Sequence, residues 1–341
     1  MKIVIDAMGG DNAPMEIVRG ALLAAEDRNI QIILAGRGED ILRCLSEMGL
    51  GTLPENVEVA NAADVITMEE DPIAAARYKT EASMTVAMRM LRDSGADAMV
   101  SAGSTGALLS CATLMLKRLR GVRRAALAPI LPSKTGGLLL IDSGATADCS
   151  PEYFLQYARM GTVCARKTLR IPEPRVGLLN IGAEPTKGGA LWREAYSLLD
   201  AAGKEGQFRF VGNMEAGTAI CGGCDVLVAD GMTGNVMLKT VEGMAELMLW
   251  EMDELLTKNG KSRLAEKLIF REMEDIRQRY DGREIGGTIL LGVTKPVVKA
   301  HGSSGTKAVC AAIRQAVRLT KSGLIGELTA ELNAGKSGRE E

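Results

Sequence analysis

The chain has 341 residues, with 41 basic and 43 acidic side chains, and its net charge is −2. It therefore lacks the excess of positive charge that is typical of a nucleic-acid-binding protein. Aromatic residues make up only 3% of the chain, which also argues against a stacking platform for bases. A chain of this length is sufficient for one large α/β domain or for two tightly joined lobes.

The first residues, MKIVIDAMGG, predict a strand rather than a signal peptide, and no apolar run is long enough to span a membrane. Seven cysteines without an export signal fit the reducing cytoplasm. Cys221 and Cys224 form one CGGC pair, but a structural zinc site needs a second pair of ligands, which the sequence does not offer. We therefore expect no metal and no cofactor, and we favour ordinary thiols over a redox pair.

Apolar strand-like runs alternate with amphipathic helical runs, which indicates an α/β fold with a mostly parallel sheet. Strands are predicted at residues 2–5, 31–35, 57–60, 128–132, 138–141, 176–180, 208–211, 226–228 and 297–298, with another that ends at residue 100. Helices are predicted at residues 15–27, 41–48, 73–79, 83–93, 152–167, 191–201, 239–258, 261–283 and 307–318. We expect one α/β/α domain over residues 1–332, with a helical excursion at 255–283 and a frayed tail at 333–341.

Four of the predicted strands end in turns of small and polar residues, and each turn leads into a helical run. The residues of the first turn, in AMVSAGSTGALL, are Ser101, Gly103, Ser104, Thr105 and Gly106. The later turns contain, in chain order, Asp142; Asp230, Thr233, Gly234 and Asn235; and His301 and Ser303. The loops after parallel strands lie along one edge of a sheet, so four turns of a single sheet would converge on one crevice. Backbone N–H groups, hydroxyls and helix N-termini in such a crevice suit an anion, most often phosphate.

The turn after the first strand carries two carboxylates beside a Gly-Gly pair: its residues are Asp6, Gly9, Gly10 and Asp11. A carboxylate does not bind phosphate directly, but it can orient a basic side chain or accept a hydrogen bond from a hydroxyl. Asp11 is equally well explained as a helix cap in a tight turn.

Three charged segments have both a functional and an ordinary explanation. Lys187 lies on the glycine-bounded loop NIGAEPTKGG, where it could clamp an anion or simply be a surface charge. The basic cluster Lys117–Arg124 could face an acidic partner or lipid headgroups, or it could serve solubility. The segment Lys261–Arg283 has apolar residues at helical spacing, and it could pack or dimerise, or lie on an anionic membrane surface.

The inventory of chemical groups excludes several reactions. His301 is the single histidine and no G-x-S-x-G elbow occurs, which argues against a serine hydrolase. No G-x-G-x-x-G follows the first strand and no P-loop occurs, so a standard dinucleotide or nucleotide site is unsupported. An anion-binding crevice with few acid–base groups instead suits a reaction in which phosphate itself is the nucleophile.

Five motifs, in this order, are DAMGGDNAP, SAGSTGALL, LLNIGAEPTKGG, VLVADGMTGNVMLK and VKAHGSS. Together they resemble the phosphate acyltransferase (PlsX) family of bacterial phospholipid synthesis, over nearly the whole chain. The resemblance implies a three-layer α/β/α Rossmann-like fold related to phosphate acetyltransferases and isocitrate-type dehydrogenases. It also implies transfer of a long-chain acyl group from acyl carrier protein to inorganic phosphate, which gives acyl phosphate for phosphatidic acid synthesis.

The same resemblance implies partners and a location. It implies a homodimer in the cytoplasm that attaches peripherally to an anionic membrane surface, through an amphipathic segment within Leu255–Tyr280. The product would pass to a membrane glycerol-3-phosphate acyltransferase. Inorganic phosphate would be a substrate rather than a cofactor.

The family's motifs also imply roles for matching residues. Lys187, His301 and Asn235 are the expected catalytic residues, with Lys187 stabilising charge and His301 orienting phosphate or the thioester carbonyl. The residues expected to bind phosphate or the rest of the substrate are Asp6, Gly9, Gly10, Asp11, Ser101, Gly103, Ser104, Thr105, Gly106, Asp142, Asp230, Thr233, Gly234 and Ser303.

Three other functions stay open at this point. The enzyme could take its acyl group from coenzyme A instead of a carrier protein. It could be a dehydrogenase of the same fold, which would need to bind nicotinamide. It could also be a membrane-associated scaffold of lipid synthesis, whose function would survive loss of Lys187 or His301.

Overall fold

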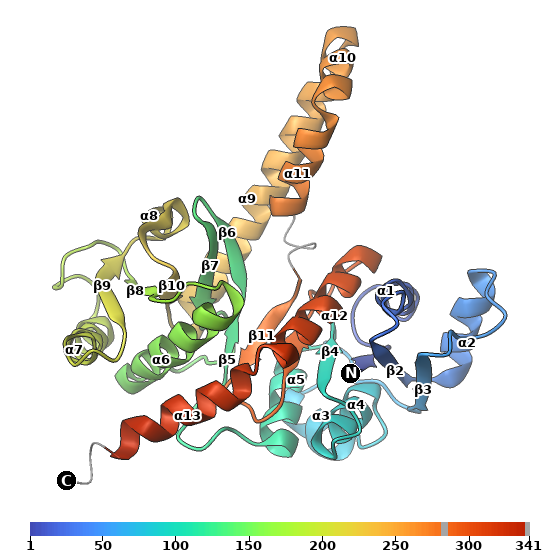
Figure 1. Cartoon of the computed structure of the whole chain (residues 1–341), viewed down its shortest axis with the longest axis horizontal. Helices are drawn as coiled ribbons and strands as arrows, with labels where there is room; N and C mark the ends of the chain where they lie inside the picture. The colour runs from blue at the N-terminus through green and yellow to red at the C-terminus, as the bar shows by residue number, and fades with distance from the viewer. Residues whose placement is uncertain (281–285, 338–341) are drawn as a thin grey trace.

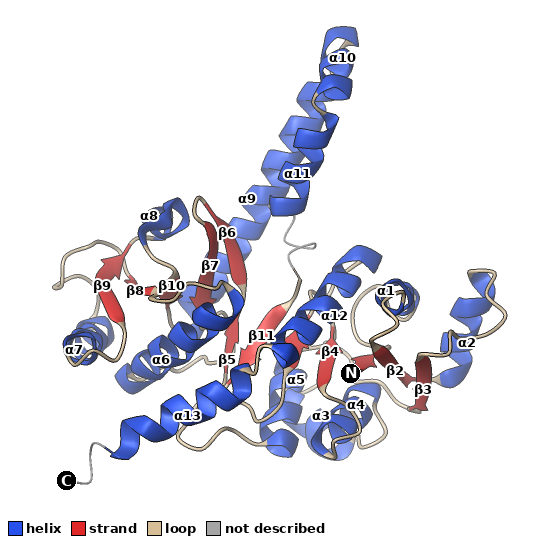
Figure 2. Ribbon diagram, viewed as in Figure 1, coloured by secondary structure: helices blue, strands red, loops and turns tan. Residues whose placement is uncertain are grey.

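The computed structural model describes residues 1–280 and 286–337, and its strands form two separate sheets with helices on both faces (Figures 1 and 2). The predicted α/β class is therefore confirmed, with a three-layer arrangement around each sheet. Sequence pattern alone left open whether the four small-residue turns share one sheet. They do not, because the structure places two of them in each sheet.

The first sheet has seven strands in the order β3-β2-β1-β4-β12-β11-β5. Its strands are β1 Lys2–Asp6, β2 Gln31–Gly36, β3 Val57–Asn61, β4 Ala98–Ser101, β5 Ala126–Ala128, β11 Thr288–Leu291 and β12 Val297–Lys299. The first five strands in this order are parallel, while β11 runs antiparallel to both β12 and β5. Its helices are α1 Met15–Ala25, α2 Gly38–Glu47, α3 Pro72–Tyr78, α4 Ser83–Arg92, α5 Thr105–Cys111, α12 Thr306–Lys321 and α13 Leu324–Ser337.

Side chains alternate between the two faces of this sheet, as the period of a strand requires. Ile3 and Ile5 of β1 belong to a core cluster with α1 and α12, whereas Val4 between them belongs to a second cluster with α4 and α5. Both faces are therefore buried, which explains why the strands are nearly continuous apolar runs.

The second sheet has five strands in the order β6-β7-β10-β8-β9, and only the pair β6–β7 is antiparallel. Its strands are β6 Ile130–Ser133, β7 Gly136–Ile141, β8 Arg175–Leu179, β9 Arg209–Met214 and β10 Val226–Val228. Its helices are α6 Pro151–Thr168, α7 Ala190–Lys204, the short α8 Ala216–Thr218 and α9 Gly231–Thr257. Two short π-helical stretches, η1 Ala112–Leu116 and η2 Ala219–Gly223, follow α5 and α8.

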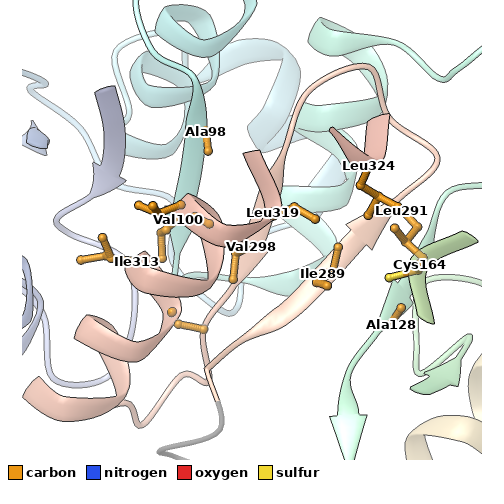
Figure 3. Packing of buried hydrophobic residues seen from close by; sticks show 14 of the residues in the cluster. Ala98, Val100, Ala128, Cys164, Ile289, Leu291, Val298, Ile313, Leu319 and Leu324 are labelled. Carbon is orange, nitrogen blue, oxygen red and sulfur yellow. The ribbon is translucent and has the colours of Figure 1, made fainter. Parts of the chain in front are cut away.

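One core cluster continues from the first sheet into the second unit. Figure 3 shows Val298 and Ile289 beneath Leu319, with Leu291 beside Cys164 of α6. Burial of this shared apolar surface contributes roughly 25 cal/mol per Å², so the two sheets are held together by the same force that holds each of them.

Helix α9 projects away from the body of the molecule and pairs with α10 Gly260–Leu268 and α11 Phe270–Tyr280 (Figure 1). Apolar side chains along this projection remain exposed; those at or near its outer end include Leu255, Leu264, Leu268 and Phe270. None of the described helices is both long and apolar enough to cross a membrane.

Four predicted boundaries were wrong. The predicted strand 128–132 is two strands of different sheets, separated by Pro129, which has no N–H to donate to a ladder. Helix α9 begins at Gly231 rather than at Lys239. The predicted helix 261–283 is interrupted between α10 and α11, and residues 281–283 lie outside the described residues. The predicted frayed tail is helical from 333 to 337, and residues 338–341 lie outside the described residues.

Candidate functional site

A cleft of about 400 Å³ lies where residues of the two sheets meet. Its lining includes residues that follow β4, β7, β10 and β12, which are the four strands with small-residue turns: Gly103, Thr105, Ser143, Gly144, Asn235, His301, Gly302 and Ser304. The predicted convergence of the turns on one crevice is thus confirmed, although two sheets rather than one build it. The cleft takes half of its polar lining from each unit.

Two lysines that the sequence analysis did not single out also line the cleft. Lys239 lies on α9, one turn after Asn235, and Lys299 is the last residue of β12. The Lys299 side chain is only 8% exposed, and its Nζ donates to the carbonyl oxygens of Ala102 (3.3 Å) and Ala300. Burial and the neighbouring Lys239 ammonium lower the pKa of Lys299 to about 8.

His301 is connected on both sides by hydrogen bonds. His301 Nε2 lies 3.0 Å from Lys239 Nζ, whose ammonium has only donors. Nδ1 lies 2.9 Å from Ser303 Oγ and 3.2 Å from the backbone nitrogen of Ser303, whose N–H donates to it. Burial and the Lys239 charge lower the pKa of His301, which favours the neutral ring. Neither ring nitrogen is left free to act as a base in this arrangement.

Asp6 lies behind the cleft and organises the turn after β4. It is 1% exposed, and it accepts hydrogen bonds from Ser83 Oγ (2.6 Å) and Ser101 Oγ (2.7 Å). Ser101 Oγ in turn accepts from the N–H of Gly103, at 3.1 Å. Burial raises the pKa of Asp6, and the two hydroxyl donors oppose that shift. Asp6 itself does not line the cleft, but it holds the turn after β4 that does.

The turn after β1 supports the turn after β12. The N–H of Asp11 donates to the carbonyl of Gly302 at 2.8 Å, and Asn12 Nδ2 donates to the carbonyl of Ser303 at 3.1 Å. Gly10 has a φ of +107°, and a Cβ there would lie 3.0 Å from the same Gly302 carbonyl. The Gly-Gly turn is therefore needed for a close approach to the His301 turn.

The turns of the second sheet are held in a similar way. Asp142 is fully buried and accepts hydrogen bonds from four backbone N–H groups, those of Leu127, Gly144, Ala145 and Thr146. Burial raises the pKa of Asp142, although these donors oppose the shift. Asp230 caps α9 and accepts from the N–H groups of Met232 and Thr233, both at 3.0 Å.

Of the other predicted residues, most support the cleft from behind. Ser104 caps α5, Gly106 packs against Pro72, and Gly234 lies against the backbone of Asp142. Lys187 lies outside the residues that line the cleft: its Nζ is 3.9 Å from Glu184, and its side chain is 45% exposed. Its catalytic role stays a prediction.

Part of the cleft lining is apolar. These residues come from β5, β6, the proline between them and α9: Leu127, Pro129, Ile130, Leu131, Pro132, Leu238, Val241 and Ala245. A ligand that joins a small anionic group to a long apolar chain would satisfy both parts of the cleft.

The described residues contain no cluster of three or more His, Cys, Asp or Glu side chains that could hold a metal ion. Of the CGGC pair, Cys221 is exposed, while Cys224 is buried and burial raises the pKa of its thiol to about 12. A thiol of that pKa is a poor nucleophile, so Cys224 is poorly suited to redox chemistry.

Sequence comparisons identify the family of the chain. A family model described as "Fatty acid synthesis protein" matches residues 1–326. A phosphate acyltransferase of Thermoanaerobacterium thermosaccharolyticum is 40% identical over 332 residues, which is 97% of each chain. One of Desulfitobacterium hafniense is 43% identical over 334 residues, which is 97% of this chain and 98% of its own. The chain belongs to the phosphate acyltransferase family.

Several solved structures are similar to this phosphate acyltransferase in fold. A phosphotransacetylase from Streptococcus pyogenes superposes with a TM-score of 0.62 at 17% identity, over 96% of this chain and 94% of its own. A putative 4-hydroxythreonine-4-phosphate dehydrogenase from Salmonella typhimurium gives a TM-score of 0.51 at 14% identity, over 94% and 99%. At these identities the likeness concerns the fold alone, and it confirms the predicted fold resembling that of phosphate acetyltransferases.

Proposed function

We propose that this phosphate acyltransferase moves a long-chain acyl group from acyl carrier protein to inorganic phosphate, and that the acyl phosphate feeds phospholipid synthesis. One observation carries the proposal: the lining of the cleft combines two lysines with a set of apolar side chains. The lysines suit phosphate, and the apolar side chains suit a fatty acyl chain.

The reaction requires positioning more than acid–base catalysis. An oxygen of phosphate attacks the thioester carbonyl, the C–S bond breaks, and the thiolate leaves with the bonding electrons. A thiol has an ordinary pKa of about 8.5, so the leaving group needs little help from a general acid. This agrees with a cleft whose single histidine is neutral and hydrogen-bonded at both ring nitrogens.

Asn235, His301 and Lys187 have different places in this proposal. Asn235 lines the cleft from the first turn of α9 and offers a neutral donor for the developing oxyanion. His301 orients Ser303 Oγ and Lys239 Nζ rather than removing a proton. Lys187 pairs with Glu184, and it would stabilise charge in the reaction only if its loop moved to bring the side chain to the cleft.

The test measures acyl phosphate formed from long-chain acyl carrier protein, with and without inorganic phosphate. We expect phosphate-dependent product, reduced in Asn235→Ala and unaffected in the surface variant Lys204→Ala, whose side chain pairs with Asp200. A parallel assay with acyl-coenzyme A separates the two donors. Lack of product from any thioester would reject the enzyme and favour the scaffold. Loss of product in Lys187→Ala would assign the charge clamp to that loop.

The projection formed by α9, α10 and α11 supports the proposed peripheral membrane attachment. Leu264, Leu268 and Phe270 are exposed near its end, next to basic side chains such as Lys261 and Lys267. Such a tip suits an anionic lipid surface. We expect the wild-type protein to sediment together with phosphatidylglycerol vesicles. A variant in which Leu268 and Phe270 are both replaced by Ser should stay in the supernatant. Light scattering of the same variant should report an unchanged oligomeric state.

The basic cluster Lys117–Arg124 is not part of the cleft. Its five cations are exposed, and its backbone is hydrogen-bonded to the loop before β12, through Leu119 N to Gly292 O at 2.9 Å. The cleft lies at the other end of β12, beyond Lys299. The cluster therefore does not help to bind a substrate in the cleft, and its exposure agrees with a role in solubility.

A further inference from the structure

Lys299 is a buried cation without an ion pair in the described part of the chain. Its Nζ contacts two backbone carbonyls, and it lies within the lining of the cleft. Carbonyl oxygens solvate an ammonium only partly, so the charge is held at a cost that burial makes large. An ammonium placed this way beside a cleft is poised to receive an anion.

Lys239 approaches the same space from the second unit. Its Nζ is 2.7 Å from Glu242 and 3.0 Å from His301 Nε2, and α9 carries it to the cleft. The two ammonium groups are close enough that the charge of Lys239 lowers the pKa of Lys299. With the cleft empty, the two cations repel each other, and Glu242 compensates only one of them.

We propose that Lys239 and Lys299 are the pair of cations that binds the phosphate substrate, with one lysine supplied by each sheet. This inference rests on the proposed function, and it adds two substrate-binding residues to those that the sequence analysis assigned. A phosphate dianion between the two ammonium groups replaces their mutual repulsion with two attractions. It also links β12 of the first sheet to α9 of the second.

A free phosphate dianion fits the pair better than the phosphodiester of a carrier's prosthetic group. Asp6 and Asp11 act on Lys299 from the side of β1, and Glu242 and His301 adjoin Lys239 on the other side. Glu242 already offsets the charge of Lys239, so the anion has to balance Lys299 and reach Lys239 as well. A free phosphate carries two charges and no ester substituents, so its oxygens can contact both ammonium groups, whereas a phosphodiester has one charge and two substituted oxygens.

Proton binding should be coupled to phosphate binding. The ligand-free protein releases the Lys299 proton near pH 8, while a bound dianion would favour the charged ammonium. Between pH 8 and pH 10 phosphate is already dianionic, so its own titration does not account for a change in this range. We expect the dissociation constant for phosphate to increase as the pH rises above 8.

The test compares Lys239→Met and Lys299→Met with the matched control Lys295→Met, which removes a lysine at the opposite end of β12 whose partner is Ser94. Phosphate binding is measured by calorimetry without an acyl donor, and KM is then measured separately for phosphate and for the acyl donor. We expect each cleft variant to weaken phosphate binding about tenfold or more, since a charge-assisted contact contributes at least 1.4 kcal/mol. KM for the acyl donor should change less than twofold.

The outcomes separate this inference from the proposed function. If the wild-type protein binds phosphate through the two lysines but forms no acyl phosphate, the proposed function is rejected and the lysine pair is retained as the phosphate site. Active variants whose phosphate affinity is unchanged would reject the pair and keep the function. A rise in KM for the acyl donor alone would assign the lysines to the phosphodiester of the carrier. In Lys299→Met the pH dependence above 8 should vanish, and circular dichroism should show that each variant is folded.

Discussion

Gly234→Ala tests how closely α9 is seated on the turn after β7. A Cβ at Gly234 would lie 1.9 Å from the carbonyl oxygen of Asp142, whereas ordinary contacts begin at 3.4 Å. The Cβ position is fixed by the backbone of α9, and the oxygen belongs to the backbone of Asp142. No side-chain rotation can relieve this contact, so α9 has to move by roughly 1.5 Å, which is a large displacement for a packed helix. Overpacking of this kind costs about 1–3 kcal/mol, and we expect a loss of stability near the upper limit.

The same displacement moves Asn235 and Lys239, which both line the cleft from the first turns of α9. A misplacement of about 1 Å can reduce a rate by about 100-fold, so we expect activity to fall by that order. The matched control is Gly243→Ala in the same helix, where a Cβ would meet no atom within 4 Å. It should raise stability by about 0.8 kcal/mol and leave activity unchanged. Urea unfolding and the acyl phosphate assay measure both effects, and wild-type behaviour of Gly234→Ala would refute the reasoning.

Three further outcomes are expected. Asp230→Ala removes the acceptor for two N–H groups at the start of α9 and should lower the free energy of unfolding by about 1 kcal/mol in urea, whereas an unchanged midpoint would contradict the cap. Iodoacetamide at pH 8 should alkylate Cys221 in the folded protein and leave Cys224 unmodified, because burial raises the pKa of the Cys224 thiol to about 12; equal labelling would argue against its burial. Folded Lys299 loses its proton near pH 8, but an unfolded lysine does so only near about pH 10.4, so the unfolded state binds more protons in this window and stability increases with pH. The free energy of unfolding of the wild-type protein should therefore increase by about 3 kcal/mol relative to that of Lys299→Met between these pH values. If the free energies of unfolding of the two proteins, measured in urea, change in parallel with pH, the lowered pKa of Lys299 is contradicted.

Local sequence signals were sufficient for most elements. The apolar run that begins at Met15 predicts α1 with the correct first residue, and the strands around β1 follow from short buried runs. The four small-residue turns were also predictable, because glycine and hydroxyl residues after an apolar run have few other uses. These signals depend on neighbours in the sequence, and the fold preserves them.

The errors arose where a contact distant in sequence decides the outcome. Thr233, Gly234 and Asn235 have low helix propensity and therefore predict a turn, yet they form the first turn of α9 against Asp142. Asp230 as an N-cap was the available signal for the true start of this helix.

The two lysines of the cleft were missed for a related reason. A lysine at the end of a short apolar strand is usually a solvated boundary residue. Only the pairing of β12 between β4 and β11 shows that Lys299 is buried. In the same way, Lys239 contacts His301 although the two residues are 62 positions apart in the chain.

The first sheet is assembled from two ends of the chain, with β12 inserted between β4 and β11. On the ribosome, β4 and the whole second sheet emerge long before residues 297–299 are made. Until then the edge of β4 has unpaired N–H and C=O groups, which are a template for wrong pairing. The strand that protects this edge also supplies Lys299 and leads into His301, so a nascent chain cannot form its cleft before this open edge is covered.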